Sequence, residues 1–352
     1  MIKLLIADDS SFMRKAICTI VEKDSDIKVI GFARNGEEAV KLVKELNPDI
    51  LTLDIEMPVL NGLEALKIIM EENPLPVIML SSLTKEGASE TLKALELGAV
   101  DYIPKEIKNT TLDILKIENE IIEKIKLIAR KKYIIRSQII RKNKERKNNE
   151  NLKYYISDDL KDKKNVKIIA IGSSTGGPGA LQQIITKLPN NLPCSIVIAQ
   201  HMPSGFTKAF AERLNSISDI KVKEAEDCEN LEDGVVYIAP GNFNMYLIKD
   251  FSKILIKIDE KDFGSLYKPS VDVLISSVAE IYGKNAVGII LTGMGCDGLK
   301  GMQKLKEKNG YIIAQDENTS IIYGMPKAVI DNNLANKICP IDEIAKEIIS
   351  LF

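Results

Sequence analysis

The 352-residue chain has a single histidine, no tryptophan and only five cysteines, and these scarcities narrow what it can do. Because His201 is the only imidazole, any acid–base chemistry through histidine must use this residue. The cysteines are scattered and form no C-x-x-C pair, which argues against a disulfide framework or a zinc site and favours a reducing cytoplasm. They are Cys18, Cys194, Cys228, Cys296 and Cys339.

The chain also lacks a charge imbalance and a long apolar run. Its 48 basic and 50 acidic residues give a net charge of −2, so nothing in the charge favours binding to nucleic acid. No apolar stretch approaches the length of a membrane span, and the N-terminus lacks the pattern of a signal peptide. We therefore expect a cytoplasmic protein that is not inserted in a membrane. Its length favours two domains.

The first third of the chain alternates short apolar runs with helical patterns, which predicts a parallel sheet covered on both faces. The predicted strands are Ile2–Ala7, Ile27–Phe32, Ile50–Leu53, Val77–Leu80 and Val100–Ile103. The predicted helices are Ser11–Glu22, Glu37–Leu46, Leu63–Glu71, Ala88–Leu97 and, at the end, Leu112–Ala129.

Residues 131–165 are rich in charge and predict a linker, because such a segment cannot bury a core. A second α/β pattern follows. Its predicted strands are Val166–Ile171, Cys194–Ala199, Val235–Ala239, Ala286–Leu291 and Tyr311–Ala314, with a hairpin of Met245–Ile248 and Ile254–Ile258. Its predicted helices are Gly179–Leu188, Thr207–Asn215, Val271–Tyr282, Leu299–Lys308 and Ile341–Leu351.

Polar side chains gather at the strand ends of the first predicted sheet. Asp8 and Asp9 follow its first strand and Asp54 follows its third. Because the carboxyl ends of parallel strands share one edge, these acids repel one another unless a cation neutralises them, and oxygen ligands suit Mg²⁺. Ser81 and Lys105 end two further strands and could hold phosphate oxygens. The set predicts formation of an acyl phosphate on Asp54.

Three catalytic residue types end three strands of the second predicted sheet. Gly172–Gly176 fits G-x-S-x-G, in which a sharp strand-to-helix turn exposes the central Ser174, and Pro178 suits the first turn of the following helix. His201 and Asp297 each follow another strand. The chemistry assigns Ser174 as nucleophile, His201 as base and Asp297 as the group that orients the imidazole.

Other interpretations compete with this triad. Gly293–Gly298 fits the dinucleotide fingerprint G-x-G-x-x-G, follows a strand, and has Asp316 near the expected acidic position. A nucleotide-binding output module without esterase activity is therefore the alternative. Ser173 is a rival nucleophile, and Asp297 could instead cap the helix that starts at Leu299.

Residues 1–106 resemble the receiver domain of bacterial response regulators, which implies a flavodoxin-like (βα)₅ fold. The resemblance rests on Asp8–Ser10, Thr52–Pro58, Asn61–Gly62, Ser81–Ser82 and Ala99–Lys105. It implies phosphorylation of Asp54 and Mg²⁺ bound by Asp8, Asp9, Asp54 and the backbone carbonyl of Glu56. It also implies phosphoryl contacts from Ser81 and Lys105. One departure is Glu106, where a proline usually follows the lysine.

Residues 166–351 resemble the catalytic domain of chemotaxis protein-glutamate methylesterases, the CheB family. The matching stretches are Ile171–Pro178, Gln200–Thr207, Tyr237–Gly241, Lys268–Asp272, Leu291–Gly298, Ala314–Glu317 and Tyr323–Pro326. The resemblance carries the triad onto Ser174, His201 and Asp297 and makes the backbone N–H of Met294 the oxyanion donor. The family often has a histidine near Asn244 and an arginine in place of Lys268.

The two resemblances together predict an α/β protein with three parts. The first is a receiver domain at 1–106, or at 1–130 if the last helix is counted with it. The second is a charged linker at 131–165, and the third is a doubly wound, mostly parallel serine-esterase domain at 166–352. The implied activity is hydrolysis of glutamyl methyl esters on methylated chemoreceptors, with deamidation of glutamines and no cofactor for the esterase step. A chemotaxis histidine kinase would supply the phosphoryl group that relieves inhibition by the receiver.

Overall fold

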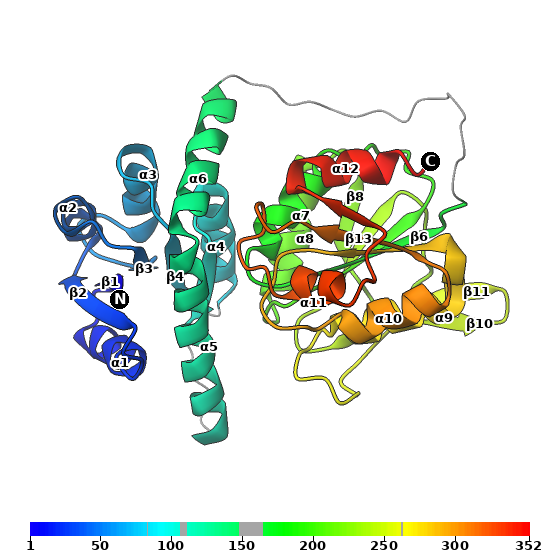
Figure 1. The fold of residues 1–352 in the computed structure, drawn as a ribbon, viewed down its shortest axis with the longest axis horizontal. Helices are drawn as coiled ribbons and strands as arrows, with labels where there is room; N and C mark the ends of the chain where they lie inside the picture. Colours follow the sequence, from blue (N-terminus) through cyan, green and yellow to red (C-terminus); the bar gives the residue numbers. More distant parts are fainter. Residues whose placement is uncertain (83, 106–110, 148–164, 262) are drawn as a thin grey trace. The chain divides into compact units, whose positions relative to one another are not determined.

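The computed structural model describes residues 1–82, 84–105, 111–147, 165–261 and 263–352 (Figure 1). The chain divides into two compact units, Met1–Glu150 and Asn151–Phe352. Both are α/β structures with parallel sheets. Within the described ranges, no helix combines the length and the apolar character needed to cross a membrane.

The first unit is built on a five-stranded sheet in the order β2-β1-β3-β4-β5, in which all neighbours are parallel. Its strands lie within two residues of those predicted: β1 (Ile2–Ala7), β2 (Ile27–Ala33), β3 (Ile50–Asp54), β4 (Val77–Ser81) and β5 (Asp101–Pro104). Every residue of β3 and β4 is buried, as expected for central strands of a parallel sheet covered on both faces.

Helices cover both faces of this sheet: α1 (Ser11–Val21), α2 (Gly36–Leu46), α3 (Gly62–Glu72), α4 (Lys85–Leu97) and α5 (Thr111–Arg130). Helix α1 packs with α5, whereas α2 packs with α3 and α3 with α4. The starts of α1 to α4 follow from capping, because the side chains of Ser10, Asn35, Asn61 and Thr84 each accept a backbone N–H of the first turn.

The charged segment after α5 differs from the prediction over its first part. Residues assigned to a linker from 131 onwards form another helix, α6 (Lys132–Lys147), and Lys132 pairs with Asp49 of the first unit. Arginine, lysine and glutamine are good helix formers, so a polar composition alone did not exclude a helix here. The rest of the predicted linker, residues 148–164, lies outside the described residues. The predicted boundaries of the receiver domain, the linker and the esterase domain therefore remain predictions.

The second unit contains a seven-stranded parallel sheet in the order β14-β13-β12-β6-β7-β9-β8. The strands are β6 (Ile168–Ser173), β7 (Ser195–Gln200), β8 (Lys221–Glu224), β9 (Val235–Ile238), β12 (Ala286–Ile290), β13 (Tyr311–Gln315) and β14 (Lys337–Cys339). From β6 the chain builds the sheet first towards β7 and later towards β12, so the strand order reverses beside β6. Ligand sites of open α/β sheets lie at this reversal, outside the carboxyl ends of the strands.

In the described part of the second unit, six α-helices flank the sheet: α7 (Gly177–Ile185), α8 (Phe206–Ile217), α9 (Val271–Tyr282), α10 (Leu299–Glu307), α11 (Met325–Asp331) and α12 (Ile341–Ile349). Helix α7 packs with α8 and α12, and α10 packs with α9 and α11 (Figure 1). The predicted hairpin is confirmed as β10 (Asn244–Asp250) paired antiparallel with β11 (Lys253–Asp259), and it packs on α9.

Four short elements of the second unit were not predicted: the edge strands β8 and β14, the helix α11 and the 3₁₀ helix η1 (Gly283–Asn285). Lys221–Glu224 and Lys337–Cys339 are short and partly polar, so their strand pattern is weak. Helix α11 has only seven residues, too few for a clear 3.6-residue period.

Close packing of β6 on α9 leads to a first prediction. A Cβ added at Gly172 would lie 2.2 Å from Cγ1 of Val271, at the start of α9. We expect Gly172→Ala to lower the free energy of unfolding of the second unit by about 1–3 kcal/mol, the usual cost of overpacking. Urea unfolding of the full chain measures the change.

The matched control is Gly179→Ala in α7, because a Cβ there meets nothing within 4 Å. This variant should be neutral or more stable by up to about 1 kcal/mol, since alanine is the better helix former. Equal stability of Gly172→Ala and the wild type would contradict the packing argument.

Candidate active site and phosphoacceptor site

The structure brings the three predicted triad residues together at the strand reversal of the second sheet. Ser174 directly follows β6, His201 directly follows β7, and Asp297 lies in the loop after β12. Because β7, β6 and β12 are neighbours, the three side chains share one edge. Backbone bonds continue the sheet here, from His201 N–H to Ser173 O at 3.1 Å and from Ser174 N–H to Thr292 O at 3.1 Å.

The imidazole of His201 lies between the hydroxyl and the carboxylate. Its Nδ1 is 3.2 Å from Ser174 Oγ, and its Nε2 is 2.8 Å from Asp297 Oδ2. With Nε2–H donating to Asp297, Nδ1 is bare and can accept the hydroxyl proton. This is the arrangement of a nucleophile, a general base and an orienting acid.

The Asp297 carboxylate is held at the N-terminus of α9. Besides His201, its donors are the backbone N–H groups of Val271 at 2.8 Å and Asp272 at 3.0 Å, and the Ser270 hydroxyl at 3.1 Å. Burial raises the pKa of Asp297, but the bond to His201, its charge and these backbone donors outweigh burial and lower it below the usual value. Asp297 therefore stays ionised beside the imidazole.

The interpretation of Asp297 as a cap for the helix at Leu299 is wrong. Gly298 occupies the N-cap position of α10 and makes no side-chain capping bond. The helix that Asp297 does contact starts 26 positions earlier in the chain, at Val271. No local sequence pattern links these two positions.

Gln200 connects the loops of the nucleophile and the base, and sequence reasoning did not identify it. Its buried amide donates to the carbonyls of Ser174 and His201, both at 3.0 Å, and accepts the Ser173 hydroxyl at 2.6 Å. The rival nucleophile Ser173 is thus fully buried and bonded away from the edge, whereas Ser174 is partly exposed. The sequence stretches Ile171–Pro178 and Gln200–Thr207 contain these serines and Gln200, but only the fold shows that the side chains are in contact.

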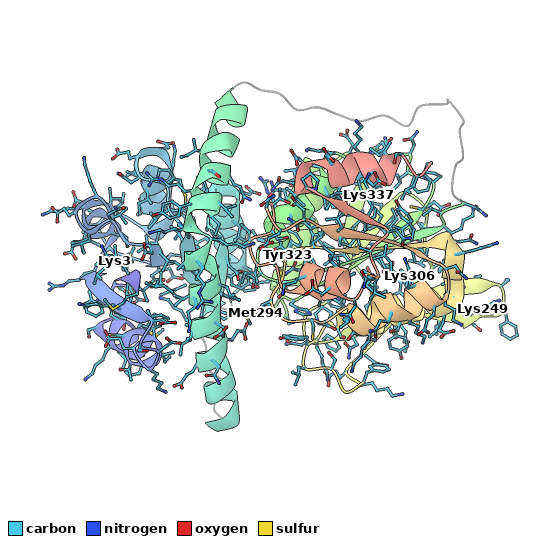
Figure 2. All side chains as sticks on the ribbon, viewed as in Figure 1. Lys3, Lys249, Met294, Lys306, Tyr323 and Lys337 are labelled. Atoms are coloured by element: carbon cyan, nitrogen blue, oxygen red, sulfur yellow. The ribbon has the colours of Figure 1, made fainter. Side chains whose placement is uncertain are left out.

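The glycine-rich loop after β12 packs against Ser174. A Cβ added at Gly293 would lie 2.9 Å from the Ser174 Cβ and 2.2 Å from Met325 Sδ, so only glycine permits this approach. Met294, the predicted oxyanion donor, comes next in this loop. Figure 2 shows Met294 and Tyr323 at the same edge of the second unit, and Gly293 forms a β-bridge with Tyr323.

These contacts give the glycines a role that does not involve a nucleotide. Asp316, the candidate ribose ligand of the alternative interpretation, accepts the backbone N–H of Thr319 at 3.1 Å and also pairs with the Thr319 hydroxyl. The Asp316 carboxylate therefore makes its hydrogen bonds within the turn Asp316–Thr319. The loop Gly293–Gly298 serves the Ser174 edge instead.

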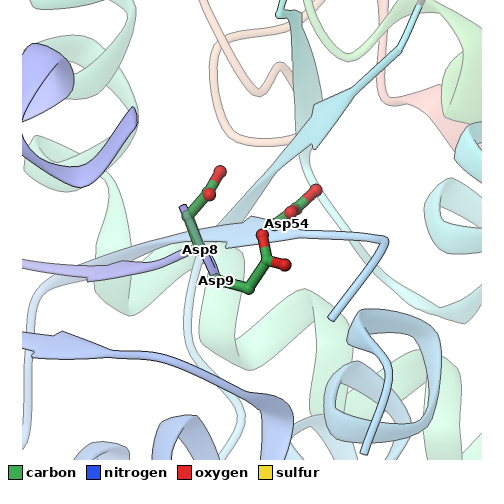
Figure 3. A group of neighbouring side chains, drawn as sticks. All are labelled: Asp8, Asp9 and Asp54. Atoms are coloured by element: carbon green, nitrogen blue, oxygen red, sulfur yellow. The ribbon is translucent and has the colours of Figure 1, made fainter. Parts of the chain in front are cut away.

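The first unit carries the predicted carboxylate cluster. One oxygen from each of Asp8, Asp9 and Asp54 lies within 4.8 Å of the others, and Figure 3 shows the three side chains converging at the ends of β1 and β3. Asp8 and Asp54 are buried and Asp9 is exposed. The Lys105 ammonium offsets part of this charge, at 3.2 Å from Asp8 and 2.6 Å from Asp54. Hard oxygen ligands with excess negative charge fit Mg²⁺.

The pKa values reflect this crowding. Burial raises the pKa of Asp54 to about 6, and the neighbouring Asp8 carboxylate adds to the rise, although Lys105 opposes it. Burial lowers the pKa of Lys105, but the Asp54 and Asp8 carboxylates outweigh burial and raise it above its usual value. Asp54, Ser81 and Lys105 also line a hollow of about 70 Å³.

The Ser81 hydroxyl lies 3.1 Å from the carbonyl of Ser82 and also contacts helix α4. It accepts a bond from Thr91 at 2.6 Å and lies 3.2 Å from the carbonyl of Gly87. Thr91 is fully buried and was missed by sequence reasoning, because a lone threonine in a helix carries no signal. A phosphoryl contact by Ser81 would compete with these bonds to α4.

Two of the three departures from family patterns can be placed. The buried Asn244 amide donates to Lys261 O and accepts the N–H of Ser270, both at 3.0 Å. The Lys268 ammonium donates to the carbonyl of Glu260 at 2.5 Å. Glu106 lies outside the described residues.

Fold and geometry together define a class of protein: a serine-hydrolase unit joined to a unit with the acidic pocket of a phosphoacceptor. Comparison with known families agrees. Residues 169–348 match the family described as CheB methylesterase, and residues 4–115 match the response regulator receiver domain. The chain belongs to the CheB methylesterase family and carries a receiver domain.

Curated relatives align with nearly the whole chain. A protein-glutamate methylesterase/protein-glutamine glutaminase of Nitratidesulfovibrio vulgaris is 44% identical over 368 residues, covering 99% of both chains. Its counterpart in Lawsonia intracellularis is 45% identical over 353 residues, again covering 99% of both chains. The crystal structure of the Thermotoga maritima CheB methylesterase catalytic domain covers 53% of this chain and 99% of its own, with 46% identity and a TM-score of 0.52.

The contacts of His201 predict its tautomer. In ¹⁵N NMR of histidine-labelled protein, at a pH where the ring is neutral, we expect Nε2 to carry the proton and Nδ1 to be bare. Because the chain has one histidine, a single set of ring signals reports the site. Asp297→Asn should weaken this preference, since the carboxylate that accepts Nε2–H is lost.

Asp272→Asn is the matched control, because this neighbouring carboxylate accepts the N–H of Gly301 rather than a bond from His201. It should leave the tautomer unchanged. A wild-type ring protonated at Nδ1 would contradict the assigned geometry.

Proposed function

We propose that Ser174, His201 and Asp297 carry the esterase reaction of this receptor-modifying enzyme. Its reaction converts a glutamyl methyl ester and water into glutamate and methanol. Ser174 Oγ attacks the ester carbon while its proton moves to His201 Nδ1. The C–O bond to the methoxy group then breaks, and the Nδ1 proton leaves with methanol. Water, activated by the same nitrogen, attacks the acyl-enzyme, and glutamate is released as Ser174 regains its proton.

One observation carries this proposal: the continuous chain of contacts from Ser174 Oγ through the imidazole to Asp297, at 3.2 and 2.8 Å. The ionised Asp297 orients the ring and stabilises the imidazolium formed in each half-reaction. We propose the backbone N–H of Met294 as the donor to the developing oxyanion, with α7 starting close by at Gly177. The esterase step needs no metal or organic cofactor in this scheme.

The substrates follow from the relatives, whose names give both methylesterase and glutaminase activities. We propose that glutamyl methyl esters and glutamine side chains of chemoreceptors are the substrates here. Deamidation would use the same acyl-enzyme, with ammonia leaving in place of methanol. Neither nucleic acid nor membrane insertion has a part in the scheme, and the scattered cysteines favour a cytoplasmic location.

The receiver is the proposed regulatory part. Receiver domains are phosphorylated in a Mg²⁺-dependent manner, and here we propose Asp54 as the acceptor and a chemotaxis histidine kinase as the donor. Asp8, Asp9, Asp54 and the backbone carbonyl of Glu56 would hold Mg²⁺, which would neutralise charge on the phosphoryl oxygens. Ser81 and Lys105 would contact the phosphoryl group. Phosphorylation then shifts the chain from an inhibited to an active population.

The nucleophile assignment is tested by Ser174→Ala. We expect methanol release from a chemoreceptor signalling fragment carrying glutamyl methyl esters to fall by about 1,000-fold or more, because the acyl-enzyme cannot form. Gas chromatography of the released methanol gives the rate.

Ser173→Ala is the matched control at the adjacent position. It loses one hydrogen bond to Gln200, worth about 1 kcal/mol, so activity should stay within about 10-fold of wild type. Methanol release that survives Ser174→Ala would refute the esterase mechanism.

Regulation is tested with a small-molecule phosphodonor and Mg²⁺. We expect these to raise methanol release by the wild type about 5-fold or more, within the usual range of coupling free energies. Asp54→Asn should abolish the response, and chelation of Mg²⁺ should abolish it in the wild type.

Asp26→Asn, which alters an exposed aspartate of the same unit, should respond like the wild type. An undiminished response of Asp54→Asn would rule out this acceptor.

A further inference from the structure

One face of the catalytic imidazole is covered by an aromatic ring that no motif identified. The ring centroids of Tyr267 and His201 are 4.2 Å apart, and the two planes differ by 13°. Tyr267 is half-buried and lies between β11 and α9, far from His201 in the sequence. His201 therefore has contacts on two edges, from Ser174 and Asp297, and a stacked ring on one face.

The stacked ring of Tyr267 restricts tilting of the His201 imidazole plane, which the two hydrogen bonds of His201 restrict only weakly. Bonds at Nδ1 and Nε2 fix the direction of the nitrogens within the ring plane, but they resist tilting of that plane only weakly. A flat ring against the face restricts the tilt. Its π-electrons also attract a cation, so stacking favours the imidazolium that forms during the reaction over the neutral ring.

The loop that carries Tyr267 is tied down by several bonds. Asn244 bonds Lys261 O and the N–H of Ser270, on either side of the tyrosine. The Lys268 ammonium bonds Glu260 O, and Lys268 O accepts the N–H of Asn242 at 3.2 Å. The same loop leads directly into Ser270, which donates to Asp297.

The phenol of Tyr267 also reaches towards the loop of the proposed oxyanion donor. A Cβ added at Gly295, the residue after Met294, would lie 3.6 Å from the Tyr267 hydroxyl. The ring thus extends from the base towards the oxyanion loop. A side chain used only to fill the loop would not need this alignment with the imidazole, and the adjacent Leu266 is 86% exposed.

We propose that Tyr267 is a positioning residue of the esterase reaction, whose aromatic ring fixes the imidazole plane of His201 and stabilises its protonated form. This inference rests on the proposed function of the triad. It assigns the effect to the ring and not to the hydroxyl, so phenylalanine should replace tyrosine and an aliphatic side chain should not.

The test compares Tyr267→Phe, Tyr267→Leu and Tyr267→Met in the full chain, with phosphodonor and Mg²⁺ present throughout. The substrate is the chemoreceptor fragment carrying glutamyl methyl esters. We expect Tyr267→Leu and Tyr267→Met to lower kcat about 10-fold with KM within about 2-fold, and Tyr267→Phe to keep kcat within about 2-fold. Two aliphatic variants are used so that a folding defect in one does not decide the result.

The matched control is Leu266→Ala, which changes an exposed side chain of the same loop and should leave kcat and KM unchanged. A second readout is ¹H NMR of the single histidine. The ring current of Tyr267 should shift the His201 ring protons upfield in the wild type and in Tyr267→Phe, and this shift should be lost in the aliphatic variants.

The outcomes separate this inference from the triad. If Tyr267→Leu and Tyr267→Met keep full kcat, or if Tyr267→Phe loses as much as they do, the ring is not a positioning element. Unchanged histidine shifts in the aliphatic variants would also overturn the inference. Activity of Ser174→Ala would instead refute the triad, while the NMR comparison would still decide whether the rings stack.

Discussion

The second unit is organised around one buried charge, the Asp297 carboxylate. A buried carboxylate is costly unless donors surround it, and here the first turn of α9 supplies two backbone N–H groups and the Ser270 hydroxyl beside the imidazole. The position of α9 is therefore tied to the position of Asp297, the proposed orienting acid. The contact of Gly172 with Val271 sets this helix against β6, the strand that also presents Ser174. Nucleophile and acid are thus placed by the same packing.

In the first unit, the buried carboxylates have fewer donors around them than Asp297 has in the second unit. Asp8 and Asp54 are buried, but the Lys105 ammonium is close to both and cannot neutralise the whole cluster, which includes Asp9. Burial raises the pKa of Asp54 to about 6, whereas the pKa of Asp297 is lowered. The difference suits the two roles. Asp297, proposed only to orient a base, is surrounded by donors of the protein, whereas Asp54, proposed to react, has fewer donors and would have its surroundings completed by a cation and a phosphoryl group.

The sequence predicted the strands and helices that carry the chemistry, because parallel strands are continuous apolar runs and their ends bear conspicuous polar residues. Ser174, His201 and Asp297 could be found this way, and so could Asp8, Asp9 and Asp54. The supporting contacts could not. Gln200, Ser270 and Tyr267 contact residues of the site that are distant from them in the sequence, and Thr91 carries no pattern of its own. The edge strands β8 and β14 were missed because they are short, and α6 because its charge resembled that of a linker.

Much of the geometry of the Ser174–His201–Asp297 site depends on the backbone. Asp297 is held by main-chain donors, Gln200 bonds two main-chain carbonyls, and Gly293 permits contact with Ser174 through its lack of a side chain. Asn244 and Lys268 likewise bond the backbone of the Tyr267 loop.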